Sequence, residues 1–316
     1  MKTVSVVMGT YNGERFLREQ LDSIINQTYP IYEIIIQDDC STDGTVGIVR
    51  EYATKYPIIK LYINEKNLGC NQNFKTAAKL ATGDYVAISD QDDIWLPEKI
   101  AKLVETIGNH DICFSHHLLY KGEDDIKESN EHDYHIEKLL FTNTVWGHTM
   151  LCQRNFVQNP SNWIDSIWCD WSLAINASLQ NGIVKVDEAL VLWRRHDMEI
   201  STKEFSKVKR KPAYHAYLFG WITYKKLLKK ENRRELYIHI YEHTDKEHFP
   251  LVHQFCDLLL KDDFVSILRL CRLCQINRHL IYFTEQHGLM GWIRGFFFPF
   301  MHAEVSSALY KDFSRI

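Results

Sequence analysis

The sequence predicts an α/β fold in which a mostly parallel central sheet is covered by helices on both faces. Short apolar runs typical of buried strands alternate with amphipathic segments typical of helices over the first 115 residues. Parallel neighbours need a long crossover connection, which a helix supplies, so this alternation favours a parallel sheet. The 316 residues are enough for one large α/β domain with a smaller appendage.

Four apolar runs are expected to form the first four strands. They occupy residues 4–8, 32–37, 58–63 and 85–89. The first helix carries apolar residues at helical spacing from Phe16 to Ile25, and the second follows the capping residues Ser41, Thr42 and Asp43. A third amphipathic segment separates the third and fourth runs.

The pattern is less regular beyond the fourth run. Further strands are expected at residues 112–115 and 149–152. Apolar runs at 183–186 and 189–193 are expected to complete the sheet, and residues 121–137 are predicted to form a charged loop.

A change in composition near residue 203 divides the chain into two expected domains. Residues 1–202 contain 18 basic and 29 acidic residues, whereas residues 203–316 contain 19 and 12. We expect a catalytic domain over 1–202 and a mainly helical, basic C-terminal region over 203–316. Basic clusters beside apolar segments gain about 1 kcal/mol per charge near anionic lipid, so this region is a candidate for peripheral membrane or partner contact. Solvated helix faces are the alternative.

The apolar segment at residues 289–301 leaves two possibilities open. Arg294 and Pro299 interrupt it, and it is too short to span a bilayer. It lies either in a membrane interface, with its aromatic rings at headgroup depth, or packed on the catalytic domain as core.

The sequence gives no indication of secretion or nucleic-acid binding. The chain enters its first strand directly after Met1, and its eight cysteines show no framework spacing, so we expect a cytoplasmic protein with free thiols. Cys271 and Cys274 lack a second pair, which disfavours a zinc site. The basic region contains no recognisable nucleic-acid motif, so no nucleic-acid partner is expected.

Polar clusters follow three of the predicted strands. They are Thr10–Glu14, Asp38–Asp39 and Asp90–Asp93. Ligands of parallel α/β sheets bind outside the carboxyl ends of the strands, so these clusters are expected to meet at one rim.

The acidic cluster predicts a metal site. In an extended backbone Asp90 and Asp92 point the same way, and two such carboxylates repel unless a cation compensates. Hard oxygen ligands suit Mg²⁺ or Mn²⁺, which can carry a diphosphate. The alternative is that these acids, Asp93 above all, cap the helix that Pro97 opens.

These motifs together resemble those of the inverting nucleotide-sugar glycosyltransferases of family two, which have the GT-A fold. The matching stretches cover roughly the first 110 residues and occupy positions 4–12, 23–29, 38–45 and 89–97. Asp90-Gln91-Asp92 matches the Asp-x-Asp motif of the family. The wording Ser-Asp-Gln-Asp-Asp-Ile-Trp at residues 89–95 is most similar to bacterial rhamnosyltransferase-like and other surface-polysaccharide transferases.

The resemblance implies roles for individual residues. Asp92 would ligate the metal, Asp90 would touch the metal or the ribose, and His196 would be a further ligand. Asp170 would be the general base, although Cys169 stands where close relatives carry histidine. The residues implied to bind the nucleotide sugar are Thr10, Tyr11, Asn12, Glu14, Asp39, Asp90 and Arg195, and those on the acceptor side are His148 and Trp171.

The function implied is transfer of a sugar from a UDP- or dTDP-sugar donor to a glycan or lipid-linked acceptor in bacterial surface polysaccharide synthesis. It would take place in the cytoplasm or on the inner face of the membrane. Two alternatives remain: a catalytically silent nucleotide-binding GT-A scaffold, and a sugar nucleotidyltransferase. The second should carry a glycine-rich loop with Arg and Lys after the first strand, which Thr10-Tyr11-Asn12 does not provide. A phosphohydrolase is disfavoured because Ser41 occupies the position of the required aspartate nucleophile.

Overall fold

The computed structural model describes residues 1–122, 125–128, 134–196, 213–282 and 287–306. It divides into two compact units. The first holds the described residues of 1–131 and 145–196, and the second those of 132–144 and 197–312. The predicted boundary between residues 202 and 203 lies outside the described part of the chain.

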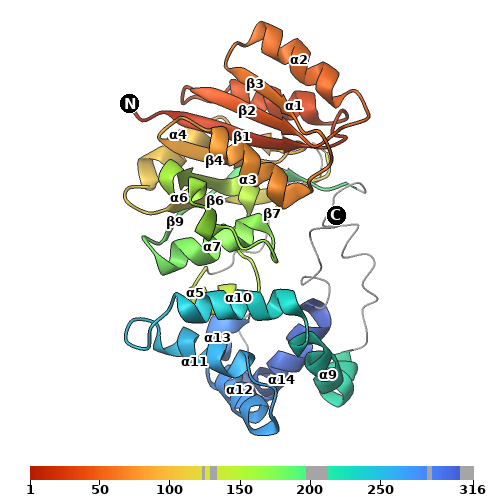
Figure 1. Ribbon diagram of the computed structural model, residues 1–316, viewed down its shortest axis with the longest axis vertical. Helices are drawn as coiled ribbons and strands as arrows, with labels where there is room; N and C mark the ends of the chain where they lie inside the picture. The colour runs from red at the N-terminus through yellow and green to blue at the C-terminus, as the bar shows by residue number, and fades with distance from the viewer. Residues whose placement is uncertain (123–124, 129–133, 197–212, 283–286, 307–316) are drawn as a thin grey trace. The chain divides into compact units, whose positions relative to one another are not determined.

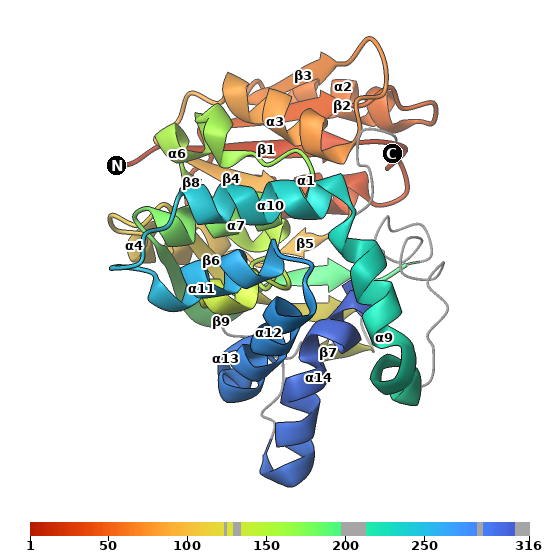
Figure 2. The ribbon, with the colours of Figure 1, turned by 60° about the horizontal axis from the view of Figure 1, so that its bottom comes forward.

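The first unit is built on one mixed sheet, whose strands lie in the order β3-β2-β1-β4-β8-β6-β9-β5, with β7 paired to β6 (Figure 1 and Figure 2). The strands are β1 (Val4–Thr10), β2 (Glu33–Asp38), β3 (Ile59–Ile63), β4 (Tyr85–Ser89), β5 (Ile94–Trp95), β6 (Ile112–Tyr120), β7 (Ile126–Glu128), β8 (Met150–Gln153) and β9 (Ile183–Arg194). The central-sheet architecture and the first four strands are confirmed.

The sheet is parallel only in part. β3, β2, β1 and β4 pair in parallel, as predicted, and so do β6 and β9. β8 is antiparallel to both β4 and β6, and β5 is antiparallel to β9.

Three expectations for the later strands need correction. The strand expected at 112–115 continues to Tyr120, and the runs at 183–186 and 189–193 form the single strand β9, which pairs with β6 through an irregular register. The predicted loop at 121–137 contains β7 and the start of a helix, while residues 123–124 and 129–133 lie outside the described part.

Helices cover both faces of the sheet, as predicted. On one face, Leu21 of α1 and Leu103 of α4 pack in one core cluster with alternate β1 residues, including Val6. On the other face α3 approaches closely, since a Cβ at Gly9 would lie 3.3 Å from the Phe74 ring. The helices of this unit are α1 (Leu17–Ile25), α2 (Thr45–Lys55), α3 (Cys70–Leu80), α4 (Lys99–Thr106), α6 (Arg154–Gln158) and α7 (Cys169–Leu179), with 3-10 turns η1 (Gly147–Thr149) and η2 (Pro160–Asn162).

The second unit is helical, as expected for the C-terminal region (Figure 2). Its helices are α5 (Ile136–Leu139), α9 (Ala213–Leu228), α10 (Glu231–Glu242), α11 (Pro250–Leu259), α12 (Phe264–Ile276), α13 (Arg278–Ile281) and α14 (Gly288–Ser306). Phe141, just after α5, meets the rings of Phe255 and Phe298 edge-on at 5.6 and 5.0 Å. The Tyr237 hydroxyl donates to the carbonyl of Leu140 (2.9 Å), so residues 134–144 belong to the core of this unit.

The apolar segment at 289–301 lies in α14 and has two environments. Phe298 is buried against Phe141, whereas Leu289, Met290 and Trp292 in the first turns are exposed. Within the described ranges, we find no helix with the length and apolar character needed to cross a bilayer.

Candidate active site

Three loops meet at the carboxyl ends of β1, β2 and β4. Because β1 is parallel to both of its neighbours, these ends share one edge of the sheet. The polar clusters found in the sequence occupy these loops, as a ligand site of this fold class requires.

The loop after β1 is tied to the loop after β2 by polar side chains. The Thr10 hydroxyl donates to the Asp38 carboxylate (2.9 Å). The side chains of Asn12 and Glu14 accept from backbone N–H groups of the loop after β2, at 2.8 and 2.6 Å. The Tyr11 side chain is exposed. Thr10, Asn12 and Glu14 therefore fix the shape of the rim.

Asp39 organises the entry to α3. Its carboxylate accepts from the backbone N–H groups of Leu68 and Gly69, at 2.7 and 2.9 Å, and from Asn64 Nδ2 at 2.7 Å. Asp39 is buried, and the three donors balance its charge there.

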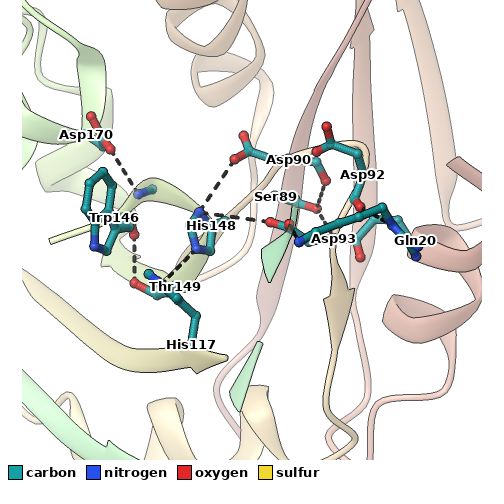
Figure 3. A network of polar contacts seen from close by, with 12 residues as sticks. Gln20, Ser89, Asp90, Asp92, Asp93, His117, Trp146, His148, Thr149 and Asp170 are labelled. Carbon is teal, nitrogen blue, oxygen red and sulfur yellow. Dashed lines mark hydrogen bonds and ion pairs between the residues drawn. The ribbon is translucent and has the colours of Figure 1, made fainter. Parts of the chain in front are cut away.

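The acidic loop after β4 meets a histidine from η1. Asp90 Oδ2 lies 3.6 Å and Asp93 Oδ2 4.0 Å from His148 Nδ1 (Figure 3). The possible ligand atoms of these three residues all lie within 4.8 Å of one another. β4 ends at Ser89, so this loop does not follow the strand alternation that the sequence analysis assumed.

Asp93 is the most constrained acid of the loop. It is only 1% exposed; Oδ1 accepts from the Arg194 N–H (3.0 Å), while Oδ2 has no hydrogen-bond partner among the described residues. Burial raises the pKa of Asp93 well above its usual range, and the charges of Asp92 and Asp90 raise it further. A cation would relieve this repulsion. Capping by Asp93 is not seen, because α4 starts at Lys99 without a side-chain cap.

Asp92 points to a different partner. Its Oδ2 lies 2.9 Å from His196 Nε2, and its carbonyl accepts from Arg194 Nε (2.9 Å). Arg195 lies over the Trp193 ring, 4.2 Å from the centroid. Asp92 and His196 are thus brought together, as a shared metal role requires, beside the cluster of Asp90, Asp93 and His148.

A buried lysine, Lys99, holds the backbone of η1 in place. Lys99 is fully buried, its Nζ donates to the His148 carbonyl (2.6 Å), and it lies 3.3 Å from the centroid of the Trp95 ring. Burial holds the pKa of Lys99 well below its usual range, although the charges of Asp93 and Asp90 act in the opposite direction. Lys99 therefore fixes the backbone that carries His148.

Asp170 lies in the first turn of α7, where Trp168 rather than Asp170 is the N-cap. Its Oδ1 accepts from the Trp171 N–H (2.7 Å) and its Oδ2 from the Gly147 N–H (3.2 Å). Burial raises the pKa of Asp170 to about 6, against these two hydrogen bonds. A carboxylate with such a pKa can accept a proton near neutrality.

The two residues expected on the acceptor side are both buried. His148 contacts His117 (Nε2 to Nδ1, 3.2 Å) and stacks on Trp193, with centroids 5.5 Å apart. His148 therefore lies with the acidic cluster, and Trp171 is a buried residue of α7.

The sequence does not predict four residues of the site, which are Gln91, Lys99, His117 and Arg194. Its pattern indicates Asp93 chiefly as a helix cap and not as a possible metal ligand. Gln91 bonds both the N–H and the carbonyl of Tyr11, at 2.9 and 3.1 Å. The sequence signal for Asp93 was the third acid of Asp90–Asp93, while Lys99 and His117 resemble ordinary helix and strand residues.

The donor set fits a hard divalent cation. Carboxylate oxygens with one imidazole nitrogen suit Mn²⁺ or Mg²⁺ better than soft metals, and the unpartnered Asp93 oxygen is aimed into the cluster. Asp90, Asp93 and His148 would hold the ion.

Comparisons with known proteins agree with this architecture. The model of the family described as "Glycosyl transferase family 2" matches residues 5–160. An uncharacterised protein of Mycobacterium tuberculosis is 31% identical over 208 residues, 61% of this chain and 59% of that protein, so the chain spans only part of that relative. The dTDP-rhamnosyl transferase RfbG of Shigella flexneri is 32% identical over 207 residues, 60% of this chain and 72% of RfbG.

Solved structures share the fold. The crystal structure of S. aureus TarS residues 1–349 in complex with UDP superposes with a TM-score of 0.56 at 17% identity, covering 96% of this chain and 91% of that one. The TarS superposition shows the GT-A fold, and the match to RfbG together with the family model shows that the chain belongs to glycosyl transferase family 2.

Proposed function

We propose that the chain is a metal-dependent, inverting glycosyltransferase that moves a sugar from a UDP- or dTDP-sugar to a glycan or lipid-linked acceptor in bacterial surface polysaccharide synthesis. RfbG is named a dTDP-rhamnosyl transferase, and the TarS structure holds UDP, which supports these two donor classes. The proposed place of action is the cytoplasm or the inner face of the membrane.

One observation carries the proposal. The three-residue turn η1 joins the acidic cluster to the candidate base, because His148 contacts Asp90 and the neighbouring Gly147 N–H donates to Asp170. The proposed cation site and a carboxylate whose pKa is raised to about 6 are thus linked by adjacent residues. Such a pairing suits a reaction that stabilises a leaving anion and activates a hydroxyl at one place.

In the proposed reaction, Asp170 accepts the proton of the acceptor hydroxyl. The acceptor oxygen bonds to the anomeric carbon as the bond from that carbon to the diphosphate oxygen breaks on the opposite face. Bound Mg²⁺ or Mn²⁺ would neutralise the charge that develops on the departing nucleoside diphosphate. Asp39 and the rim loop after β1 are proposed to bind the nucleoside, and Arg195 the diphosphate.

The test begins with a panel of UDP-, dTDP- and GDP-sugars, screened by thermal shift with Mn²⁺ and then by product analysis. One donor should raise the melting temperature, since a ligand that binds only the folded state stabilises it. Asp170→Asn should keep this shift and lose transfer by about 10²- to 10⁴-fold, the usual contribution of a general base.

The outcomes separate the proposal from its alternative. If the protein binds a donor but transfers nothing to any acceptor and does not hydrolyse it, a silent scaffold is the better account. Full activity of Asp170→Asn would assign the base elsewhere.

A further inference from the structure

Helix α9 of the second unit presents an apolar stripe to solvent. The stripe consists of Tyr214, Leu218, Trp221 and Ile222, which are 62%, 61%, 53% and 41% exposed. Leu218 follows Tyr214 by four residues, and Trp221 and Ile222 follow Leu218 by three and four residues. This spacing places all four side chains on one face of the helix. We call these four residues the α9 stripe.

The opposite face of α9 is already used. A Cβ at Gly220 would lie 2.8 Å from Phe300 Cβ, and the Tyr224 and Phe300 rings meet at 5.8 Å, so α9 packs tightly on α14. Ala216, Leu227 and Leu228 are buried as well. A helix that is apolar on both faces is normally buried all round, so the exposed α9 stripe calls for a partner.

Lysines continue the same side of α9. Lys225, Lys226 and Lys229 follow the stripe and are exposed, and residues 213–230 contain four lysines and no acidic residue. A surface that pairs aromatic and aliphatic side chains with adjacent lysines complements a bilayer interface, where rings lie at headgroup depth and lysines meet anionic headgroups.

We propose that the α9 stripe and its lysines dock the protein on an anionic lipid surface. The first turns of α14, the helix that packs on α9, add a second apolar exposure in Leu289, Met290 and Trp292, with Arg294 beside them. A helix face without acids favours anionic lipid over a second copy of this positively charged face, which it would repel. Docking would hold the enzyme at the surface where a lipid-linked acceptor resides, and only this purpose rests on the proposed function.

The experiment sediments the full-length protein with vesicles of phosphatidylcholine alone and of phosphatidylcholine with phosphatidylglycerol. Wild type should bind the second kind more tightly. Leu218→Glu with Trp221→Glu should reduce that binding at least tenfold, because two charges enter the apolar stripe. Lys225→Gln with Lys226→Gln should weaken it by about fivefold per lysine, and only on anionic vesicles.

Ile238→Glu on α10 is the matched control, since it places the same charge at another exposed apolar position of the same unit, and it should bind vesicles as wild type does. Circular dichroism and Mn²⁺-dependent UDP binding, unchanged in every variant, show that the fold and the first unit are intact. If wild type does not bind UDP, this counts against the proposed function but does not affect the conclusion drawn from vesicle binding.

Three results would overturn the docking proposal. Wild type that fails to sediment with anionic vesicles is one, and equal binding to both kinds of vesicle is another. The third is a stable wild-type dimer that Leu218→Glu with Trp221→Glu converts to monomer, because that assigns the α9 stripe to self-association.

Discussion

Gly147 and His148 link the proposed base, Asp170, to the proposed metal site. The Gly147 N–H donates to the Asp170 carboxylate, and the His148 ring contacts Asp90. A Cβ at Gly147 would lie 3.3 Å from Asp170 Cβ, so a larger residue there would press on the base. The position of Asp170 therefore depends on a turn that has no side chain at its first residue.

The raised pKa of Asp170 predicts the pH dependence of transfer. A general base acts when deprotonated, so kcat/KM should be low below pH 6, rise through about pH 6 and level off above it. A pH profile of kcat/KM with saturating Mn²⁺ measures this. A kcat/KM that stays constant from about pH 5 to about pH 7, which spans the expected midpoint, would exclude Asp170 as the titrating base.

Lys99 is expected to matter through the backbone of η1 rather than by touching substrate. Lys99→Met removes the donor to the His148 carbonyl and leaves that buried acceptor unpaired, which costs about 1–3 kcal/mol. We expect a lower melting temperature and weaker Mn²⁺ binding, measured by calorimetry. Lys102→Met on the same helix removes a surface partner of Glu188 and should change stability by less than about 0.5 kcal/mol. Equal effects of the two substitutions would refute the special role of Lys99.

At the level of elements, Glu33 ties β2 to its neighbours. Its buried carboxylate accepts from Ser5 Oγ (2.7 Å), from the Thr82 N–H (2.7 Å) and from Lys60 Nζ (2.6 Å). One side chain thus holds together β1, β3 and the turn between α3 and β4. Burial opposes ionisation, but the hydrogen bonds, that of Lys60 first, lower the pKa of Glu33 to about 2.

The lowered pKa gives a prediction for acid stability. A depressed folded-state pKa stabilises the protein above the unfolded value, near 4.5, and this contribution is lost as pH falls from there towards 2. Glu33→Gln should therefore destabilise the protein at pH 7 and have progressively less effect below pH 4.5, as followed by urea unfolding. A destabilisation that stays constant over this pH range would contradict the assignment.

The elements differ in how far the sequence could predict them. β1 to β4 and the helices between them were predictable because each apolar run is bounded by capping or turn residues, such as Asp43, whose Oδ1 accepts from the Thr45 N–H (3.0 Å). The antiparallel placement of β8 and β5 was not, since register between distant strands is set by tertiary packing. β6 and β9 extend through polar residues such as His116 and Asp187, which local periodicity does not assign to strands.

On the scale of the molecule, the sequence predicted the motif residues of the site better than the buried residues that support them. Asp90, Asp92, His196 and Asp170 stand in recognisable motifs, and the structure brings Asp92 to His196. The roles of Lys99 and Asp93 depend on burial, which arises only when η1 packs beside β4 from about sixty residues further along the chain. No local pattern carries that information.

The most direct test of the account is a calorimetric titration of UDP into the protein with and without Mn²⁺, in wild type and in Asp90→Asn. Asp90 belongs to the cluster with Asp93 and His148 whose ligand atoms all lie within 4.8 Å of one another. We predict that wild type binds UDP only with Mn²⁺ and that Asp90→Asn weakens this binding at least about tenfold, since even the loss of a residue that only orients a metal ligand typically costs about 10- to 100-fold. UDP binding that ignores Mn²⁺ in wild type, or that survives unchanged in Asp90→Asn, would contradict a cation-held diphosphate at the end of β4.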